Sequence, residues 1–384
     1  ATLAAIDLYT QKYPNVKIEG EYGAFGNYYQ KLLTQLAGGT APDIVQIDYK
    51  FVHDLIVQGK PFVNMNTMTN KIDMSGLDMK FAKEQCGEGD YLIGLPEGIN
   101  GMGLIYNVQV LKDAGISIDN NWDWDKLMDA GIKLRQFDKN KNLLFLTNDH
   151  YGFLVKTQIK QKTGNNFIKD DYTLGFQRND IVDVFKYIKD MTDKGVVPPF
   201  EESVPFEGVY ADQNPNWLSG KYAIFATSAS IIPSITKASK FPVDVARYPV
   251  PKDAKNPGII TSPSMILSIY NKSANIDEAA KFINWLMNDK DAIMAITDTR
   301  GLPAVKNART ILTEAKKVDP NITKMVEEAL PFSGGSESPL STNQEIDTIL
   351  KDYIHKLGYR KLTPEQAADS LIKDLGDKLK EFKK

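Results

Sequence analysis

The chain has 384 residues, of which 42% are hydrophobic and 25% charged, as in an ordinary soluble globular protein. This length exceeds the size at which one hydrophobic core usually stops growing, so two domains are expected. The 46 basic and 49 acidic residues are mixed along the chain, which argues against a nucleic-acid-binding stripe or an anionic-membrane surface. No run of about 18 apolar residues occurs, so no transmembrane helix is predicted.

The N-terminal part alternates predicted helices and strands. Apolar residues at helical spacing predict helices, and period-two alternation or a short apolar run predicts strands. The expected helices span 1–13, 27–37 and 51–59, and the expected strands span 16–22 and 42–48. This order favours a mostly parallel sheet with helices on both faces.

Helical patterns dominate the rest of the chain, with three further strands. The expected helices span 122–137, 179–195, 275–289, 308–318, 322–330, 343–357 and 363–382, and the strands 221–228, 241–250 and 264–271. Asn179 is an expected N-cap, and Thr363 with Pro364 marks the start of the last helix. Two polar loops, 250–258 and 331–342, separate these elements.

The common catalytic motifs are absent. The sequence contains no phosphate loop, no Gly-x-Ser-x-Gly and no His-Glu-x-x-His, and its three histidines lie in different parts of the chain. The single cysteine, Cys86, is interpreted as an incidental loop thiol, since a nucleophile needs a paired base. The sequence therefore predicts a protein without a cofactor and without catalysis.

One partial metal motif is present. Asp138, Asn140 and Asn142 have the spacing that opens a calcium loop. The sixth position is Leu143 where glycine is needed, and the twelfth is Asp149 where glutamate is usual. A polar turn with local side-chain bonds between a helix and a strand is the favoured interpretation.

Several segments resemble, in the same order, family 1 of the extracellular solute-binding proteins, which includes maltose-type sugar receptors. YTQKYPNVKIEGEY resembles the family's first helix and second strand, and YLIGLPEGINGMGLIYNVQVLKDAGI its most characteristic stretch. The other matching segments are KLLTQLAGGTAPDIVQID, WDWDKL, NWLSGKYAIFATSAS, EAAKFINWLMND and KLTPEQAADSL. The resemblance spans nearly the whole chain, and it rests on the ordered set because each segment alone is weak.

The resemblance implies a two-lobed α/β fold of the periplasmic-binding-protein type, with ligand held in a cleft by hinge closure. The expected lobes comprise residues 1–107 plus 261–312 and residues 108–260 plus 313–384, joined by three crossing segments. The implied role is the non-catalytic solute-binding component of an ABC importer, which delivers a carbohydrate, an oligosaccharide above all, to membrane permease subunits.

The resemblance also sets expectations about what precedes the chain and where it acts. Relatives carry a strand and a small loop before their first helix, so any ligand contact from that loop lies outside this sequence. An extracytoplasmic location is expected, either periplasmic or on the cell surface through an upstream lipid anchor. A monomer is expected.

Sugar receptors meet hydroxyl groups with polar side chains and ring faces with aromatic ones, so the candidate ligand residues are residues of these types in loops after strands. They are Tyr22, Phe25, Asn27, Tyr28, Asp48, Tyr49, Glu97, Asn100, Ser228, Ser230, Ser262, Ser264, Phe332, Ser333 and Glu337. Asp48 equally fits an N-cap, the aromatic residues near position 25 equally fit packing roles, and residues 331–342 equally fit an ordinary surface loop. Trp124, Trp217 and Trp285 are interpreted as structural, and Trp122 is left open.

Other ligands and one enzymatic function remain as alternatives. A polyamine or a peptide would keep the transport role and change the ligand. An anion is disfavoured because no arginine lies in an expected ligand loop. A glycoside hydrolase would need two nearby carboxylates, for which Asp48 and Glu97 are the candidates.

Overall fold

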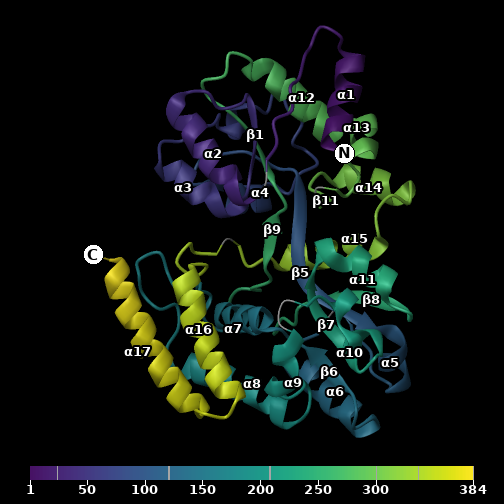
Figure 1. Ribbon diagram of the computed structural model, residues 1–384, viewed down its shortest axis with the longest axis vertical. Helices are drawn as coiled ribbons and strands as arrows, with labels where there is room; N and C mark the ends of the chain where they lie inside the picture. The colour runs from purple at the N-terminus through teal and green to yellow at the C-terminus, as the bar shows by residue number, and fades with distance from the viewer. Residues whose placement is uncertain (24, 120–121, 207–208, 300, 336, 384) are drawn as a thin grey trace. The chain divides into compact units, whose positions relative to one another are not determined.

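The computed structural model describes residues 1–23, 25–119, 122–206, 209–299, 301–335 and 337–383 (Figure 1). The chain forms two compact units. Unit 1 comprises Ala1–Asn100 and Ser262–Thr323, and unit 2 comprises Gly101–Thr261 and Lys324–Lys384. The chain passes between them three times, within β5 (Gly98–Asn107), β9 (Thr261–Pro263) and α15 (Pro320–Ala329). The expected lobe boundaries, after residues 107, 260 and 312, stay a prediction.

Unit 1 is built on a three-stranded sheet in the order β1 (Ile44–Ile47), β10 (Ile266–Ile269) and β4 (Leu95–Pro96). Its other elements are α1 (Thr2–Lys12), α2 (Phe25–Gly38), α3 (Val52–Val57), α4 (Met79–Cys86), β2 (Gly87–Glu88), β3 (Tyr91–Leu92), α12 (Ile276–Asn288), α13 (Lys290–Ile296), β11 (Leu302–Pro303) and α14 (Lys306–Glu314). Aromatic packing joins α1 to α12, where the Tyr9 and Phe282 ring centroids lie 5.0 Å apart.

The strand expected over residues 16–22 is wrong. Most of this segment is exposed, and no strand is assigned there within the described part of the chain. Alternating polarity is not sufficient for a strand, because a strand also needs a hydrogen-bonded neighbour.

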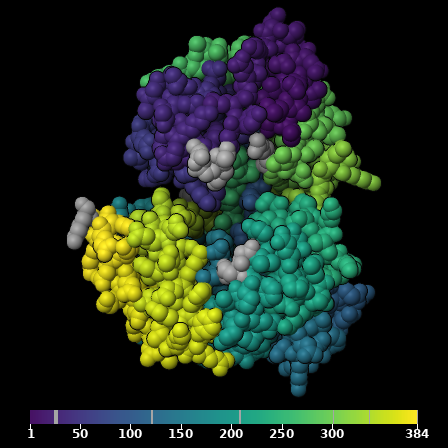
Figure 2. Space-filling view, in the orientation of Figure 1, coloured from purple at the N-terminus to yellow at the C-terminus, as the bar shows by residue number. Residues whose placement is uncertain are grey.

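Unit 2 contains a sheet in which β5 pairs with both β7 (Tyr222–Ser228) and β8 (Val243–Arg247), and β7 pairs with β6 (Asn142–Phe145). Its helices are α5 (Val108–Asp113), α6 (Trp124–Phe137), α7 (Asn148–Thr163), α8 (Arg178–Asp193), α9 (Phe200–Ser203), α10 (Pro215–Leu218), α11 (Ile232–Ala238), α16 (Gln344–Gly358) and α17 (Pro364–Phe382). The yellow helices α16 and α17 adjoin on one face in Figure 2. Thr363 caps α17 as expected. The expected N-cap Asn179 is wrong, because α8 begins at Arg178 and its N-cap is Gln177, two positions earlier.

The expectation of mostly parallel sheets is wrong. Among the strand pairs with a described register, β6 and β7 are parallel, and all the others are antiparallel. The physical reason in unit 2 is that β5 enters the unit between β7 and β8 and runs opposite to both. The helix-flanked α/β character of each unit agrees with the expectation.

The tryptophans are packing residues. Trp217 is completely buried, and its indole Nε1 donates to Ser239 Oγ at 3.0 Å. Trp124 is buried and donates to Gln161 Oε1 at 2.7 Å. Trp285 and Trp122 are also buried, so the structural interpretation is confirmed and extends to Trp122.

Cys86 was expected in a loop and instead ends α4, where it is completely buried. Burial raises the pKa of its thiol. A thiol of this kind is unreactive because the thiolate is the nucleophilic form.

His150 closes the N-terminus of α7. The Thr147 backbone N–H donates to His150 Nδ1 at 3.4 Å, while the His150 backbone N–H donates to Thr147 Oγ1 at 3.4 Å. Burial lowers the pKa of His150 to about 4 from the usual 6.5. The geometry agrees with this direction, because a protonated ring would lose the Nδ1 acceptor.

We predict that His150 makes the free energy of unfolding fall as the pH is lowered from 6.5 towards 4. The unfolded chain binds a proton in this window and the folded chain does not, so acid favours unfolding. Urea titrations at several pH values measure the effect. His150→Gln keeps an acceptor at this capping position and should flatten the fall, whereas His53→Gln should retain it. Parallel curves for wild type and H150Q would exclude His150 as the source.

Candidate functional site

In unit 1, the candidate residues at the end of β1 are joined to the start of β5 by a polar pair. Gln46 is the polar residue of the strand Ile44–Ile47, and its Nε2 donates to Glu97 Oε2 at 2.6 Å. The Glu97 backbone N–H donates to Met265 O at 2.9 Å, which holds this segment beside β10. Sequence reasoning missed Gln46. A half-buried amide inside an otherwise apolar strand is the signal that identifies it.

Asp48 has the capping role that sequence reasoning weighed against ligand binding. Its Oδ1 accepts from the Lys50 backbone N–H at 2.9 Å and caps the short 3₁₀ helix Tyr49–Phe51. Phe51 at the end of this turn stacks on Tyr29 of α2, with centroids 3.6 Å apart and planes 6° apart. Sequence reasoning also missed these two aromatic residues. The available signal is their place in the sequence, since Tyr29 follows the candidate Tyr28 and Phe51 lies two residues after the candidate Tyr49.

The remaining unit 1 candidates divide into those near Glu97 and those on α2. Asn100 lies in β5 and Ser262 in β9, and the Ser264 backbone N–H donates to Gly98 O at 2.9 Å. Tyr22 is 81% exposed, and no described contact joins it to the candidates near Glu97. Tyr28 is half-buried on α2. Phe25 and Asn27 begin α2, and their side chains lie outside the described part of the structure.

In unit 2, the candidate serines lie where two segments meet the end of β7. Ser228 is opposite Met102 of β5, and its hydroxyl lies 3.1 Å from the Ser230 hydroxyl. Ser333 Oγ lies 2.7 Å from Thr261 Oγ1, and Ser333 also pairs with Ile259. These contacts make two separate hydroxyl pairs in unit 2.

The loop 331–342 is held firmly in place. Lys160 Nζ donates to Glu337 Oε1 at 2.8 Å, and the lysine side chain is only 5% exposed. Further along, Ser341 Oγ accepts from the Ile168 backbone N–H at 2.8 Å and donates to its carbonyl at 2.9 Å. These bonds anchor the loop to α7 and to Ile168, and Glu337 has a structural partner.

Arg247 is a functional candidate that sequence reasoning excluded. The Arg247 guanidinium carbon lies 4.3 Å from the ring centroid of Phe332, and its Nη1 donates to Tyr248 O at 2.9 Å. Burial lowers the pKa of Arg247, and burial raises the pKa of Glu328 on the nearby α15. Arg247 lies on β8, 85 positions before Phe332 in the sequence, so only the fold brings a cation to this candidate residue.

The calcium candidate forms the polar turn that was the favoured interpretation. Asp138 Oδ1 accepts from the Asn140 backbone N–H at 2.9 Å, and Asn142 Nδ2 donates to Gly195 O at 2.9 Å. Within the ranges that the structure describes, no group of three or more His, Cys, Asp or Glu side chains is arranged to hold a metal ion.

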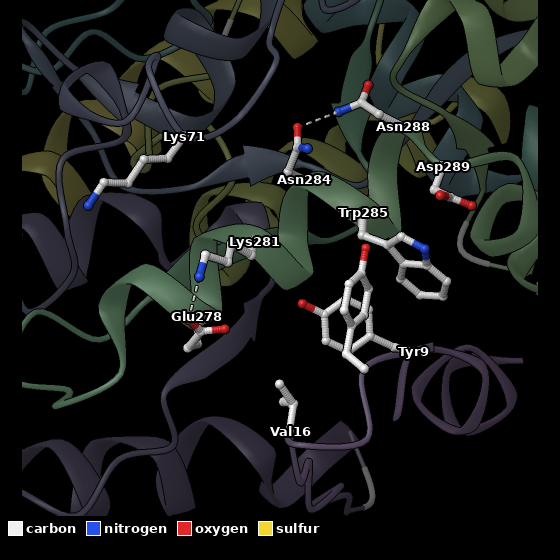
Figure 3. A pocket seen from close by; sticks show the side chains of 10 residues that line it. Tyr9, Val16, Lys71, Glu278, Lys281, Asn284, Trp285, Asn288 and Asp289 are labelled. Atoms are coloured by element: carbon white, nitrogen blue, oxygen red, sulfur yellow. Dashed lines mark hydrogen bonds and ion pairs between the residues drawn. The ribbon is translucent and has the colours of Figure 1, made fainter. Parts of the chain in front are cut away.

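A pocket of about 500 Å³ lies in unit 1 between α1 and α12, away from the predicted ligand residues (Figure 3). Tyr9 and Trp285 form its aromatic side. Its charged and amide groups have partners inside and outside the lining, among them the Lys281–Glu278 pair at 2.5 Å and the bond from Lys12 to Asp289 at 2.8 Å. Asn288 Nδ2 likewise donates to Asn284 Oδ1 at 3.2 Å. We interpret this pocket as a surface groove of the unit.

Across the described residues, no helix is long and apolar enough to span a membrane. A family model for bacterial extracellular solute-binding proteins matches residues 4–324. The chain belongs to this family. The resemblance found in the sequence and the expected extracytoplasmic, solute-binding role are thereby confirmed.

Two characterised relatives show how far the similarity extends. The arabinooligosaccharide-binding protein of Halalkalibacterium halodurans is 22% identical over 49% of this chain and 42% of its own length. The chain thus matches less than half of that relative. The sn-glycerol-3-phosphate-binding periplasmic protein of Salmonella paratyphi A is 22% identical over 98% of this chain and 88% of its own length.

Solved structures confirm the fold class. A periplasmic oligogalacturonide-binding protein of Yersinia enterocolitica has a TM-score of 0.83 at 23% identity, covering 99% of this chain and 95% of its own. A de novo designed cysteine esterase has a TM-score of 0.88 at 24% identity, covering 100% and 95%. At these identities the likeness establishes the two-lobed solute-binding-protein fold and not a ligand or an activity.

We predict that Asp48→Ala lowers the free energy of unfolding by about 1 kcal/mol, while Asp48→Asn leaves it nearly unchanged. Asparagine caps a helix about as well as aspartate, and alanine cannot accept the Lys50 N–H. Urea denaturation of both variants measures the difference. Equal stability of D48A and wild type would show that the cap contributes nothing, and would leave Asp48 without this structural role.

Proposed function

We propose that this protein is the solute-binding component of an ABC importer and that its solute is a carbohydrate, with an oligosaccharide favoured over a single sugar. The observation that carries the proposal is the pairing of polar and aromatic groups at strand ends in each unit. Unit 1 contains both the Gln46–Glu97 pair and the Tyr29–Phe51 stack, and each includes a residue at or just after the end of β1 in the sequence. Ser228, Ser333 and Phe332 provide the same chemistry in unit 2.

The Gln46–Glu97 pair suits sugar recognition. A carboxylate accepts hydrogen bonds from hydroxyl groups, and an amide both donates and accepts, so the pair fits neighbouring hydroxyls of a ring. The 2.6 Å bond between them orients both groups before ligand arrives. Such preorganisation lowers the entropy lost on binding.

Aromatic side chains supply the apolar part of the proposed site. The Phe51 and Tyr29 rings are nearly parallel and stacked, and Phe51 lies in the turn that Asp48 caps. In unit 2, one face of Phe332 is occupied by Arg247. Carbohydrate ring faces pack on such surfaces, and small-molecule sites combine apolar walls with a few fixed polar groups.

Two relatives' names, an arabinooligosaccharide-binding protein and an oligogalacturonide-binding protein, support the carbohydrate class. We further propose that binding involves no chemistry. Asp48 is engaged in a cap and Glu97 with Gln46, which suits neither for the acid–base pair of a hydrolase. We also propose that the protein acts as a monomer, that its partners are the permease subunits of the importer, and that a lipid anchor lies upstream of this sequence.

A solute with an oxyanion is a second candidate. Arg247 lies against Phe332, and a relative that matches nearly the full chain binds sn-glycerol 3-phosphate. Arginine is the side chain best suited to phosphate or carboxylate. An acidic sugar would combine both chemistries.

We predict that a thermal-shift panel of neutral oligosaccharides, acidic oligosaccharides, glycerol 3-phosphate, polyamines and peptides yields a carbohydrate as the stabilising ligand. At a hundred times its Kd the ligand should stabilise the protein by about 2.7 kcal/mol, which raises the melting temperature by a few degrees at this chain length.

Glu97→Gln and Phe332→Leu should each weaken binding in calorimetry, whereas Lys237→Gln, an exposed substitution elsewhere in unit 2, should not. Stabilisation by a polyamine or peptide alone would overturn the carbohydrate class. Reducing sugars released from the bound oligosaccharide would overturn the absence of catalysis.

We also predict that the stabilising ligand lowers the radius of gyration measured by small-angle X-ray scattering, because the expected hinge closure compacts a two-lobed receptor. The same titration with a carbohydrate that gives no thermal shift is the control. An unchanged radius at saturation would argue against closure while leaving binding intact.

A further inference from the structure

Unit 2 contains a second pocket, of about 450 Å³, at the other end of its sheet from Ser228. It lies where β6 and β7 begin, and Asn142 and Tyr222 are paired there in the parallel register. Its lining includes Arg135, Lys139, Lys141, Lys221, Glu202 and Ser219. The pocket shares no residue with the proposed solute site.

The pocket is strongly cationic. Four of its lining residues are lysine or arginine, and Glu202 is its one lining carboxylate. Glu202 Oε1 is 2.5 Å from Lys221 Nζ and accepts from the Tyr222 hydroxyl at 2.9 Å, so one cation is neutralised. Arg135, Lys139 and Lys141 then leave three positive charges around one cavity. Like charges at close range repel, and a bound anion would relieve that repulsion.

Arg135 is held in a defined position. A Cβ at Gly195 would lie 2.9 Å from Arg135 Nε, so the side chain lies directly against the backbone there, where Gly195 has φ +70°. Arg135 Nη1 donates to Lys141 O at 3.3 Å. A guanidinium has five N–H donors in a fixed plane, and this one bond leaves most of them for a ligand. Planar, oriented donors match the paired oxygens of a phosphate or carboxylate.

Residues 139–142 of the polar turn line the same pocket. The turn carries part of a calcium-loop motif, but Lys139 and Lys141 within it, together with Arg135 and Lys221, make its surroundings positive. Lys141 Nζ donates to Gly220 O at 2.9 Å, which places its ammonium at the pocket wall. The exposed Lys139 and the half-buried Arg135 flank it. This environment repels calcium and attracts an oxyanion.

We propose that this cavity, the Arg135 pocket, binds a phosphate-type oxyanion, carried either by a small soluble phosphate or by the headgroup of an anionic lipid. Ser219 adds a hydroxyl to the cationic wall. The site is distinct from the solute site and does not depend on which solute the protein carries.

The test is calorimetric titration of the full chain with inorganic phosphate at low ionic strength, because salt screens exposed charges. Saturable one-to-one binding is expected, weakened roughly tenfold or more in Arg135→Gln and in Lys139→Gln by loss of a charge-assisted bond. Lys237→Gln removes the same charge away from the pocket and should bind as wild type does. Lys139 is exposed, so this variant tests the site even if R135Q folds poorly.

Three outcomes would overturn the proposal. The first is the absence of saturable phosphate binding. The second is an equal loss of binding in K237Q and K139Q. The third is a loss of binding in Arg247→Gln that R135Q and K139Q do not share, because that result would place the anion at the solute site.

A second experiment identifies the source of the oxyanion. Co-sedimentation with phosphatidylglycerol vesicles, reduced in K139Q and absent with phosphatidylcholine, supports a lipid headgroup, and phosphate binding without vesicle binding supports a soluble ligand.

Discussion

The hydrogen-bonded ladders of β5 are the interaction on which unit 2 depends. Met102 pairs with Ser228 of β7, and Gly103 pairs with Arg247 of β8, so one strand sets the position of both candidate ligand residues. Shifting this register by one residue would turn every side chain to the other face. Gly103 is required at the contact, because a Cβ there would lie 2.8 Å from Met325 of α15 and 2.9 Å from Ala246 O.

Buried ion pairs attach the C-terminal segments of unit 2 to α7. Lys160 and Lys156 project from α7 and are almost fully buried, the first bonded to Glu337 and the second to Asp347 of α16, each at 2.8 Å. Breaking such a pair leaves an uncompensated buried charge, which typically costs about 3–5 kcal/mol. The loop that carries Phe332 and Ser333 is thus positioned by charges that lie outside the proposed ligand surface.

The two ends of the unit 2 sheet differ in chemistry. The end near Ser228 has hydroxyl pairs and the Phe332 ring. Arg247 stacks on this ring and is hydrogen-bonded to the backbone. The end near Asn142 has three cations that no lining carboxylate neutralises. The proposed carbohydrate site uses the first end, and the proposed oxyanion site uses the second. On these two proposals the ligands would bind at opposite ends of one sheet and would not compete.

Local patterns determined much of this protein from sequence alone. Apolar spacing and capping residues located most helices to within a few residues, because they depend on contacts three or four residues apart. The ordered motifs identified the family, because a set of short matches in the family order is specific even though each match alone is weak. Strand direction and the missing strand at 16–22 were not accessible in this way, because a strand is defined by a partner that lies far away in the sequence.

Only the tertiary structure decided which side chains meet. Gln46 meets Glu97 across 51 positions, and Arg247 meets Phe332 across the end of a sheet. The turn at Asp138 is a polar turn already by its sequence, but only the fold brings Arg135 and Lys221 to the pocket beside it. Composition and periodicity encode what each segment prefers, but the sign and shape of a site depend on distant residues that only folding brings together.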